Sequence, residues 1–240
     1  MKTVLVTGGG GAIGAAICGR FARENFNILV ADRNREAAER VAREVNGKAL
    51  VFDIADYGEA KAALGGARVD ILVNNAGWDR FQNFADTKPE EWDALIDINL
   101  RGPLNMHHLV IPGMLARGSG RVVNVSSDAA RVGSSGESVY SACKGGIISF
   151  SKTLAREVAR QGITINVVCP GPTDTPILRG FLGEGEAGKK VYDALVRAIP
   201  MKRVGQPDDI PGIVAFLASD EAAFITGQVI SVSGGLTMAG

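Results

Sequence analysis

The stretch Val4-Leu5-Val6-Thr7-Gly8-Gly9-Gly10-Gly11-Ala12-Ile13-Gly14 decides the fold. It opens with a short apolar run typical of a buried strand, and its glycines lead into a segment of helical period, 12–24. Glycines at such a turn let the backbone approach a pyrophosphate, which lies on the free N–H groups of the helix N-terminus. A strand-to-helix turn that binds nothing would use glycines too, so the rest of the chain must decide.

The same alternation of strand and helix continues along the chain. Further strands are predicted from apolar runs at 28–30, 49–52, 71–73, 122–125, 163–168 and 229–232. Segments of helical period lie between them, at 34–46, 89–116, 139–161 and 207–219. Near-continuous apolar runs are typical of strands covered on both faces, and strand–helix–strand repetition predicts right-handed crossovers. We therefore expect one α/β domain over 1–240, a doubly wound parallel sheet of the Rossmann type that binds ligands at the carboxyl ends of its strands.

Composition and charge exclude several classes of protein. The 26 basic and 26 acidic residues cancel, and no like-charge block stands out, so we expect no nucleic acid or membrane partner. The three cysteines have no metal-ligand spacing, and the adjacent His107 and His108 would point to different faces of a helix, so we predict no metal site. No apolar run approaches the ~20 residues of a membrane span. A strand at the very start leaves no room for a signal peptide, and we expect a cytoplasmic protein.

Asp32 follows the second predicted strand and is the candidate ribose-binding residue. It lies 18 residues after Gly14, near the spacing of about 20 at which a carboxylate accepts hydrogen bonds from the adenosine ribose. A carboxylate there would repel a 2′-phosphate, so Asp32 predicts NAD rather than NADP, although the neighbouring Arg33 could pair with such a phosphate. The structural alternative is that Asp32 caps the next helix.

Tyr140 and Lys144 form a candidate acid/base pair. They stand four residues apart, so a helix places them on one face. An ammonium beside a tyrosine favours the phenolate and lowers the tyrosine pKa from about 10, which suits the general acid/base of an alcohol oxidation. Ser127 follows the strand at 122–125, where its hydroxyl could hold a substrate oxygen. A turn serine is the alternative, and that role is equally open to Ser126.

Together these motifs resemble the short-chain dehydrogenase/reductase family. The resemblance extends over essentially the whole chain, and it departs from the usual family pattern at Ala12, where most members have glycine. The residues that carry it are Thr7-Gly8-x-x-x-Ala12-x-Gly14, Asn74-Asn75-Ala76-Gly77, Asn99, Ser127, Tyr140-x-x-x-Lys144, Pro170-Gly171-x-x-x-Thr175 and Gly234-Gly235.

The resemblance implies a catalytic role for each of four residues. Tyr140 is implied to be the general acid/base, and Lys144 to lower its pKa and bind the nicotinamide ribose. Ser127 is implied to orient the substrate oxygen, and Asn99 to hold a water in a proton relay through Lys144. A homotetramer built on the segments 89–116 and 139–161 is also implied.

The resemblance also implies the cofactor contacts. The segment 74–77 is expected to support the sheet beside the adenosine, Asp53 to meet the adenine edge, and Thr175 to contact the carboxamide or the phosphates. The full expected set is Gly8, Gly11, Ala12, Ile13, Gly14, Asp32, Arg33, Asp53, Ile54, Asn75, Ala76, Gly77, Tyr140, Lys144, Pro170, Gly171, Thr173 and Thr175.

The segment around 176–200 is the expected substrate lid. Its apolar residues recur at helical spacings, and its glycines would give it mobility, although a plain packed connection has the same pattern. The segments 75–79, 127–137 and 168–175 further resemble dehydrogenases of cyclic β-hydroxyacyl-CoA thioesters such as 2-hydroxycyclohexanecarboxyl-CoA. This implies NAD-dependent oxidation of the secondary alcohol of an acyl-CoA thioester, with Trp78, Arg131 and Ser134 lining the acyl site.

Three other functions share part of the pattern. A β-ketoacyl-acyl carrier protein reductase using NADPH has the same catalytic motifs, but Asp32 and the balanced charge count against it. A sugar or polyol dehydrogenase is less consistent with an apolar lid. A non-catalytic dinucleotide-binding regulatory protein would need a broken site, yet the serine, tyrosine and lysine are all in place.

Overall fold

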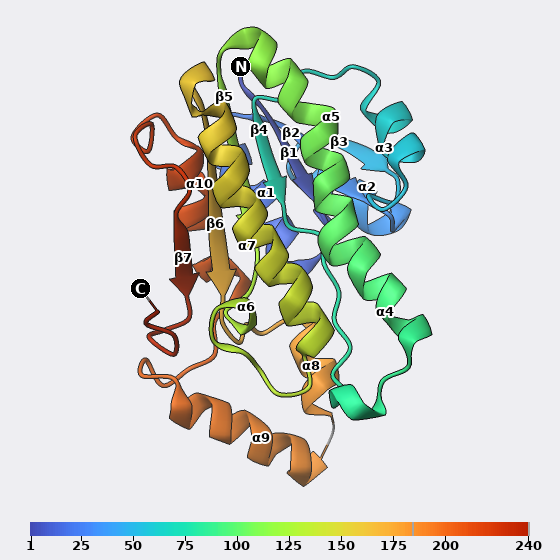
Figure 1. Cartoon of the computed structure of the whole chain (residues 1–240), viewed down its shortest axis with the longest axis vertical. Coiled ribbons are helices and arrows are strands. Elements are labelled where there is room, and N and C mark those ends of the chain that lie inside the picture. The colour runs from blue at the N-terminus through green and yellow to red at the C-terminus, as the bar shows by residue number, and fades with distance from the viewer. Residues whose placement is uncertain (184, 240) are drawn as a thin grey trace.

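The computed structural model describes residues 1–183 and 185–239. Within these residues a parallel sheet of seven strands lies at the centre, in the order β3-β2-β1-β4-β5-β6-β7 (Figure 1). The strands are β1 (Thr3–Thr7), β2 (Asn27–Asp32), β3 (Lys48–Val51), β4 (Ile71–Asn74), β5 (Gly120–Val125), β6 (Ile163–Pro170) and β7 (Val229–Val232). The predicted fold class is confirmed, and each predicted strand is present.

Helices cover both faces of the sheet (Figure 1). Their bounds are α1 (Ala12–Arg23), α2 (Arg35–Glu44), α3 (Tyr57–Leu64), α4 (Pro89–Ile96), α5 (Gly102–Arg117), α6 (Ala129–Val132), α7 (Ser138–Val158), α8 (Pro176–Leu182), α9 (Gly185–Ala198) and α10 (Pro211–Ala218). None of the described helices is long and apolar enough to cross a bilayer.

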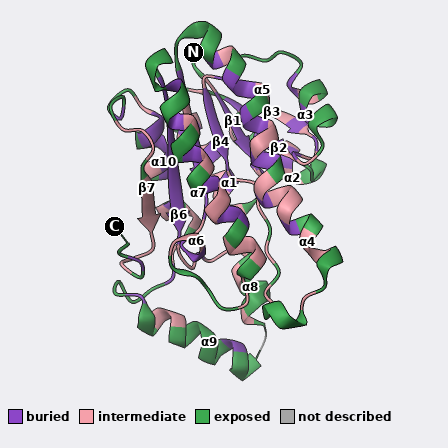
Figure 2. Ribbon diagram, viewed as in Figure 1, coloured by how far each residue is buried: buried purple, intermediate pink, exposed green. Residues whose placement is uncertain are grey.

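Alternate side chains of each strand serve two hydrophobic cores. Val4 and Val6 of β1 pack in the core under α1, α2 and α10, whereas Leu5 between them packs in the core under α3, α5 and α7. This is the two-residue period of a strand whose faces are both covered. Strands β4 and β6 are accordingly buried throughout their length, and β1 is buried after its first residue (Figure 2).

The predicted helix 89–116 is wrong as a single element. The chain forms α4, then a π-helical turn at Asp97–Arg101, and then α5. Pro103 in the first turn of α5 has no backbone N–H, so a regular α-helical ladder cannot continue through it. The break places Asn99 in the π-turn, where it is fully buried. The short helix α3 was not predicted.

The strand order reverses between β1 and β4. Strand β1 pairs with β2 on one side and with β4 on the other, so the connections from these strands leave in opposite directions. A crevice opens at such a point beyond the carboxyl ends of the strands. The glycine-rich loop follows β1 at this edge, and the segment 75–77 follows β4.

Candidate active site

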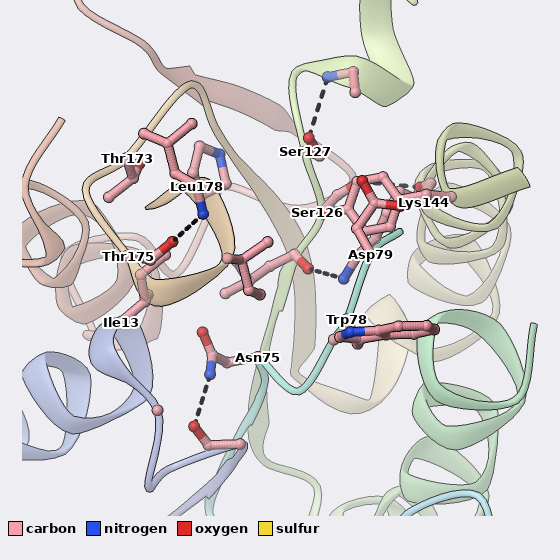
Figure 3. Close-up of a pocket in the computed structure, with 18 of the residues that line it drawn as sticks. Ile13, Asn75, Trp78, Asp79, Ser126, Ser127, Lys144, Thr173, Thr175 and Leu178 are labelled. Carbon is pink, nitrogen blue, oxygen red and sulfur yellow. Dashed lines mark hydrogen bonds between the residues drawn. The ribbon is translucent and has the colours of Figure 1, made fainter. Parts of the chain in front are cut away.

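One cavity of about 750 Å³ lies at the carboxyl ends of the strands. It is lined by the glycine-rich loop, the ends of β2, β4, β5 and β6, the start of α7, and α8 (Figure 3). Its volume is in the usual range for a site that binds a cofactor or small ligand. Of the predicted cofactor contacts, every one lines it, as do Ser127, Trp78 and Ser134.

The glycine-rich loop packs too closely for side chains. A Cβ on Gly14 would lie 2.1 Å from the carbonyl oxygen of Gly8, and Gly8 itself has a φ of +61° and would meet the Cα of Ala76 at 2.7 Å. At the start of α1 no side chain caps the helix and no acidic residue occupies the first turn. Its N–H groups therefore remain available to an anion, and the loop fits a pyrophosphate.

Asp32 holds the glycine-rich loop and lines the cavity, and it does not cap α2. Its carboxylate accepts hydrogen bonds from the backbone N–H of Gly10 (3.0 Å) and of Asn34 (2.9 Å). The cap of α2 is Asn34, whose side chain accepts from the N–H of Ala37 at 3.0 Å. Exposed Arg33 lines the cavity beside Asp32. The capping alternative for Asp32 is thereby removed.

The segment after β4 is hydrogen-bonded to the end of β1 and to the glycine-rich loop. The side-chain amide of Asn75 donates to the carbonyl oxygens of Thr7 and Gly8, both at 3.1 Å (Figure 3). The Thr7 hydroxyl in turn accepts from the N–H groups of Asn75 (3.1 Å) and Ala76 (3.2 Å). These bonds fix the loop and the segment as one rigid wall of the cavity.

Ser127, Tyr140 and Lys144 come together on the opposite wall. Ser127 follows β5, while Tyr140 and Lys144 lie on one face of α7, and all three side chains line the cavity. The Lys144 ammonium donates to the carbonyl of Val125 at 3.1 Å and lies 5.7 Å from the centroid of the Tyr140 ring. Ser126 has a different role, because its hydroxyl donates to the Lys144 carbonyl at 3.0 Å.

The lysine is buried and is still a cation at neutral pH. Burial lowers the pKa of Lys144 to about 8, and the negative charge of Asp79 acts in the opposite direction. A Cβ on Gly77 would lie 2.9 Å from the Lys144 nitrogen, so the backbone after β4 fits closely against this ammonium.

The electrostatics at Tyr140 differ from the expectation that Lys144 lowers its pKa. In the protein alone, burial raises the pKa of Tyr140, the hydrogen bond from Ser127 lowers it, and the carboxylates of Asp79 and Glu137 raise it further. The ammonium of Lys144 is directed at a backbone carbonyl, and two carboxylates oppose its effect on the phenol. A positive charge over the ring, such as an oxidised nicotinamide carries, would lower the pKa.

Asn99 does not line the cavity. Its side-chain nitrogen donates to the carbonyls of Trp78 (2.7 Å) and Leu95 (3.0 Å), and its oxygen accepts from the Trp78 N–H at 3.3 Å. The amide thus holds the loop after β4 in place. Its part in a proton relay stays a prediction.

Two further predicted residues are placed by contacts of their own. Thr175 lines the cavity and also caps α8, since its hydroxyl accepts from the Leu178 N–H at 3.4 Å (Figure 3). Arg131 is directed elsewhere, which corrects its assignment to the acyl site. Its guanidinium donates to the Ser231 hydroxyl at 2.8 Å and to the Ala239 carbonyl, so it holds the C-terminal segment.

The expected lid forms two helices, and part of it reaches the cavity. Ile177, Leu178 and Phe181 of α8 and Leu195 of α9 line the cavity, while most of α9 is exposed to solvent (Figure 2). The Phe181 ring stacks on Phe81 with centroids 3.8 Å apart. The apolar spacing that predicted a lid therefore supplies one wall of the site.

The two histidines take structural positions. His107 is buried, accepts from the Asn124 side chain (3.2 Å) and lies 2.6 Å from the Pro103 carbonyl. His108 is paired with the Tyr57 hydroxyl at 2.8 Å.

Comparison with known proteins agrees with this geometry. The model of the family described as Enoyl-(Acyl carrier protein) reductase matches residues 10–237. An acetoacetyl-CoA reductase from Shinella zoogloeoides is 39% identical over 240 residues, 98% of each chain. The chain belongs to the short-chain dehydrogenase/reductase family.

Solved structures of family members share the fold. A 3-oxoacyl-[acyl-carrier protein] reductase with bound NAD from Brucella melitensis has a TM-score of 0.91 and 33% identity, over 99% of this chain and 92% of that one. A gluconate 5-dehydrogenase from Burkholderia cenocepacia in complex with NADP and tartrate has a TM-score of 0.93 and 32% identity, over 100% and 96%. This short-chain dehydrogenase/reductase is therefore an NAD(P)-dependent oxidoreductase. The non-catalytic alternative is not supported.

Sequence reasoning did not single out several residues of the dehydrogenase/reductase site. Asp79, Phe81 and Glu137 are among those that line the cavity. Asp79 and Phe81 directly follow the 74–77 motif, and Glu137 lies three residues before Tyr140, so proximity to a motif was the available signal. No local pattern indicated that two separate loops bring the carboxylates together.

Proposed function

We propose that this enzyme interconverts 3-hydroxyacyl and 3-oxoacyl thioesters, preferably those of CoA, with NAD(H) as the cofactor. The observation that carries the proposal is that Ser127, Tyr140 and buried Lys144 line the same cavity as the glycine-rich loop. The hydride acceptor or donor would be the nicotinamide of a cofactor bound along that loop.

The three side chains divide the proton chemistry. Ser127 would hold the substrate oxygen by a hydrogen bond, and Tyr140 would donate a proton to it during reduction or accept one during oxidation. The Lys144 ammonium is held in place by its hydrogen bond to the Val125 carbonyl. In this position it would bind the ribose of the cofactor and stabilise the Tyr140 phenolate. Asn99 would add the proton relay that the family resemblance implies.

Asp32 supports NAD over NADP. Its carboxylate is fixed by two backbone N–H groups at the end of β2 and borders the cavity. A 2′-phosphate would have to approach this charge closely, and the exposed Arg33 beside it is the opposing influence. The family member with bound NAD is consistent with this preference, while the member with NADP shows that the fold accepts both.

The charges of the cavity support a thioester over a free hydroxy acid. Among the described lining residues only Arg33 and Lys144 are basic, and Arg33 lies beside the ribose-binding Asp32. Asp79, Asp128 and Glu137 also line the cavity, and they would repel a substrate carboxylate. Masking that carboxylate as a thioester removes the repulsion, and the apolar lid suits the acyl chain.

The relatives favour a reductase of linear 3-oxoacyl thioesters over a dehydrogenase of cyclic β-hydroxyacyl-CoA thioesters. Two of those cited are named for acetoacetyl-CoA and for 3-oxoacyl groups on a carrier protein, the third is named for gluconate, and none is named for a cyclic acyl-CoA. The carrier-protein reductase is thus the second candidate. The cyclic thioester 2-hydroxycyclohexanecarboxyl-CoA is itself a 3-hydroxyacyl-CoA, so it stays within the proposed substrate class.

A substrate panel tests the proposal. Nicotinamide absorbance is followed with each of NAD(H) and NADP(H), using acetoacetyl-CoA, 3-hydroxybutyryl-CoA, 2-hydroxycyclohexanecarboxyl-CoA, the free acids and a 3-oxoacyl carrier protein. We expect turnover of CoA thioesters with NAD(H) and at most weak turnover of the free acids. Turnover of sugars or free acids alone would refute the proposed substrate class, and turnover confined to NADPH with the carrier protein would establish the second candidate.

We further propose, on family resemblance, that the enzyme is a homotetramer. Exposed apolar side chains such as Leu236 and Met238 near the C-terminus support a buried contact there. Light scattering coupled to size-exclusion chromatography would report about four times the chain mass.

A further inference from the structure

Two carboxyl groups meet in the active-site cavity beside the catalytic tyrosine. Asp79 lies in the loop after β4, and Glu137 immediately precedes α7, the helix that carries Tyr140. Both line the cavity, and Glu137 acts on the Asp79 carboxyl to raise its pKa. Asp79 projects into the site next to Lys144 (Figure 3). Two carboxyl groups that share a site favour a state in which one of them carries a proton.

The backbone holds the two loops together. The N–H of Gln82 donates to the Gly136 carbonyl at 2.9 Å, which fastens the loop after β4 to the residue before Glu137. On the other side of Asp79, the Trp78 backbone is held by both side-chain atoms of Asn99. These bonds keep the two loops that carry the carboxyl groups next to each other.

One oxygen of the Asp79 carboxyl group, Oδ2, is buried and has no hydrogen-bond partner among the described residues. The other oxygen, Oδ1, accepts from the N–H of the adjacent Arg80 at 2.8 Å. Burial, the hydrogen bond with Glu137 and the charge of Glu137 raise the pKa of Asp79 to about 7, and Lys144 opposes them. Like charges close together resist ionising together, so the pair keeps a proton to higher pH than a lone carboxyl group does.

We propose that Asp79 and Glu137 share a proton and act as positioning residues that set the pH at which Tyr140 exchanges its proton with the substrate oxygen. This inference rests on the proposed function, because it requires Tyr140 to be the acid/base. The pair carries one negative charge when it holds the shared proton and two when it has lost it. The second charge makes the phenolate harder to form, so it keeps Tyr140 protonated to higher pH.

The groups that face Tyr140 determine the direction in which its pKa changes when a carboxylate is removed. Burial raises its pKa first, the Ser127 hydroxyl of the β5 loop lowers it, and Asp79, Glu137 and Cys169 of β6 raise it. Lys144, on the same helix as Tyr140, lowers the pKa of Asp79 and so favours loss of the shared proton. Removing either carboxylate therefore lowers the tyrosine pKa.

The test compares Asp79→Asn with wild type and with Asp86→Asn. The control removes the same charge from the same connection, where Asp86 is exposed and does not line the cavity. We measure log(kcat/KM) against pH in both directions with a thioester that the wild type turns over. In Asp79→Asn the alkaline rise in oxidation and the alkaline fall in reduction both move to lower pH by about one unit. The control superimposes on wild type.

Glu137→Gln provides an independent variant in case Asp79→Asn alters the loop. It should shift the profiles in the same direction, and both variants should lose the inflection near pH 7 that the wild type owes to the shared proton. Absorbance titration of tyrosinate, taken as the difference between each protein and its Tyr140→Phe form, should show the same shift without turnover. Profiles and titrations that coincide in wild type and both variants would overturn the inference. Activity retained by Tyr140→Phe alone would instead overturn the proposed function.

Discussion

Gly77→Ala should impair catalysis by inserting a methyl group between the side chains of Lys144 and Asn99. A Cβ at this position would lie 2.9 Å from both the Lys144 nitrogen and the Asn99 side-chain oxygen. Ordinary van der Waals contact begins at 3.4 Å, so each group must move by about half an ångström. Gly77 does not have a positive φ, so alanine meets no backbone strain and the effect is steric.

The magnitude follows from how these side chains are held. Lys144 is bonded to the Val125 carbonyl and Asn99 to the Trp78 backbone, so neither can retreat freely. A misplacement of about 1 Å can lower the rate about 100-fold. A displacement of about half that distance therefore predicts a loss of about tenfold in kcat, or about 1.4 kcal/mol in the activation free energy. Crowding in a packed site should also cost about 1–3 kcal/mol of unfolding free energy.

The assay is initial-rate kinetics together with denaturant unfolding of the same preparations. Gly145→Ala is the matched control, because it lies next to Lys144 on α7 and its Cβ would have only one neighbour, at 3.9 Å. That variant should keep wild-type kcat. Gly77→Ala with the kcat and stability of wild type would refute the close packing on which the argument depends.

Two other perturbations test separate parts of the structure. Asp32→Ala should raise kcat/KM for NADP relative to NAD on the order of tenfold, because it removes a charge that would repel the 2′-phosphate. An unchanged ratio would show that Asp32 only holds the backbone of Gly10 and Asn34 and does not select the cofactor. Burial lowers the pKa of His107 to about 4, below the 6.5 of an exposed histidine, so the unfolded chain gains a proton first as pH falls. His107 therefore favours the folded state fully above pH 6.5, and this contribution should fall by up to about 1.4 kcal/mol per pH unit between pH 6.5 and 4. In His107→Gln the unfolding free energy should depend less steeply on pH in that window, and an equal slope would show that other groups cause it.

The sheet and the cofactor loop could be predicted because their signals are local. Each strand is a contiguous apolar run, and the glycine-rich loop, Asp32 and the Tyr140–Lys144 pair depend on short spacings within one or two elements. The sheet topology then carries these elements to one edge. Helix 89–116 was mispredicted because its apolar period hides the π-turn at 97–101.

The remaining features depend on contacts between distant segments. Arg131 turns away from the cavity because β7 and the C-terminal segment return beside it and accept its hydrogen bonds. The pairing of Asp79 with Glu137 depends on two loops whose mutual placement is set by the Gln82–Gly136 bond. Burial of Tyr140, with the charges of Asp79 and Glu137 in addition, raises its pKa in the protein alone, opposite to the expected direction.

The most direct test of the central claim is the turnover of Tyr140→Phe with NAD(H) and the thioester that the wild type uses best. The substitution removes only the hydroxyl that exchanges the proton, so kcat should fall by at least about 10²-fold while the dissociation constant for NAD stays within a few fold of wild type. Turnover close to that of wild type would contradict the assignment of Tyr140 as the acid/base and, with it, the proposed chemistry of the site.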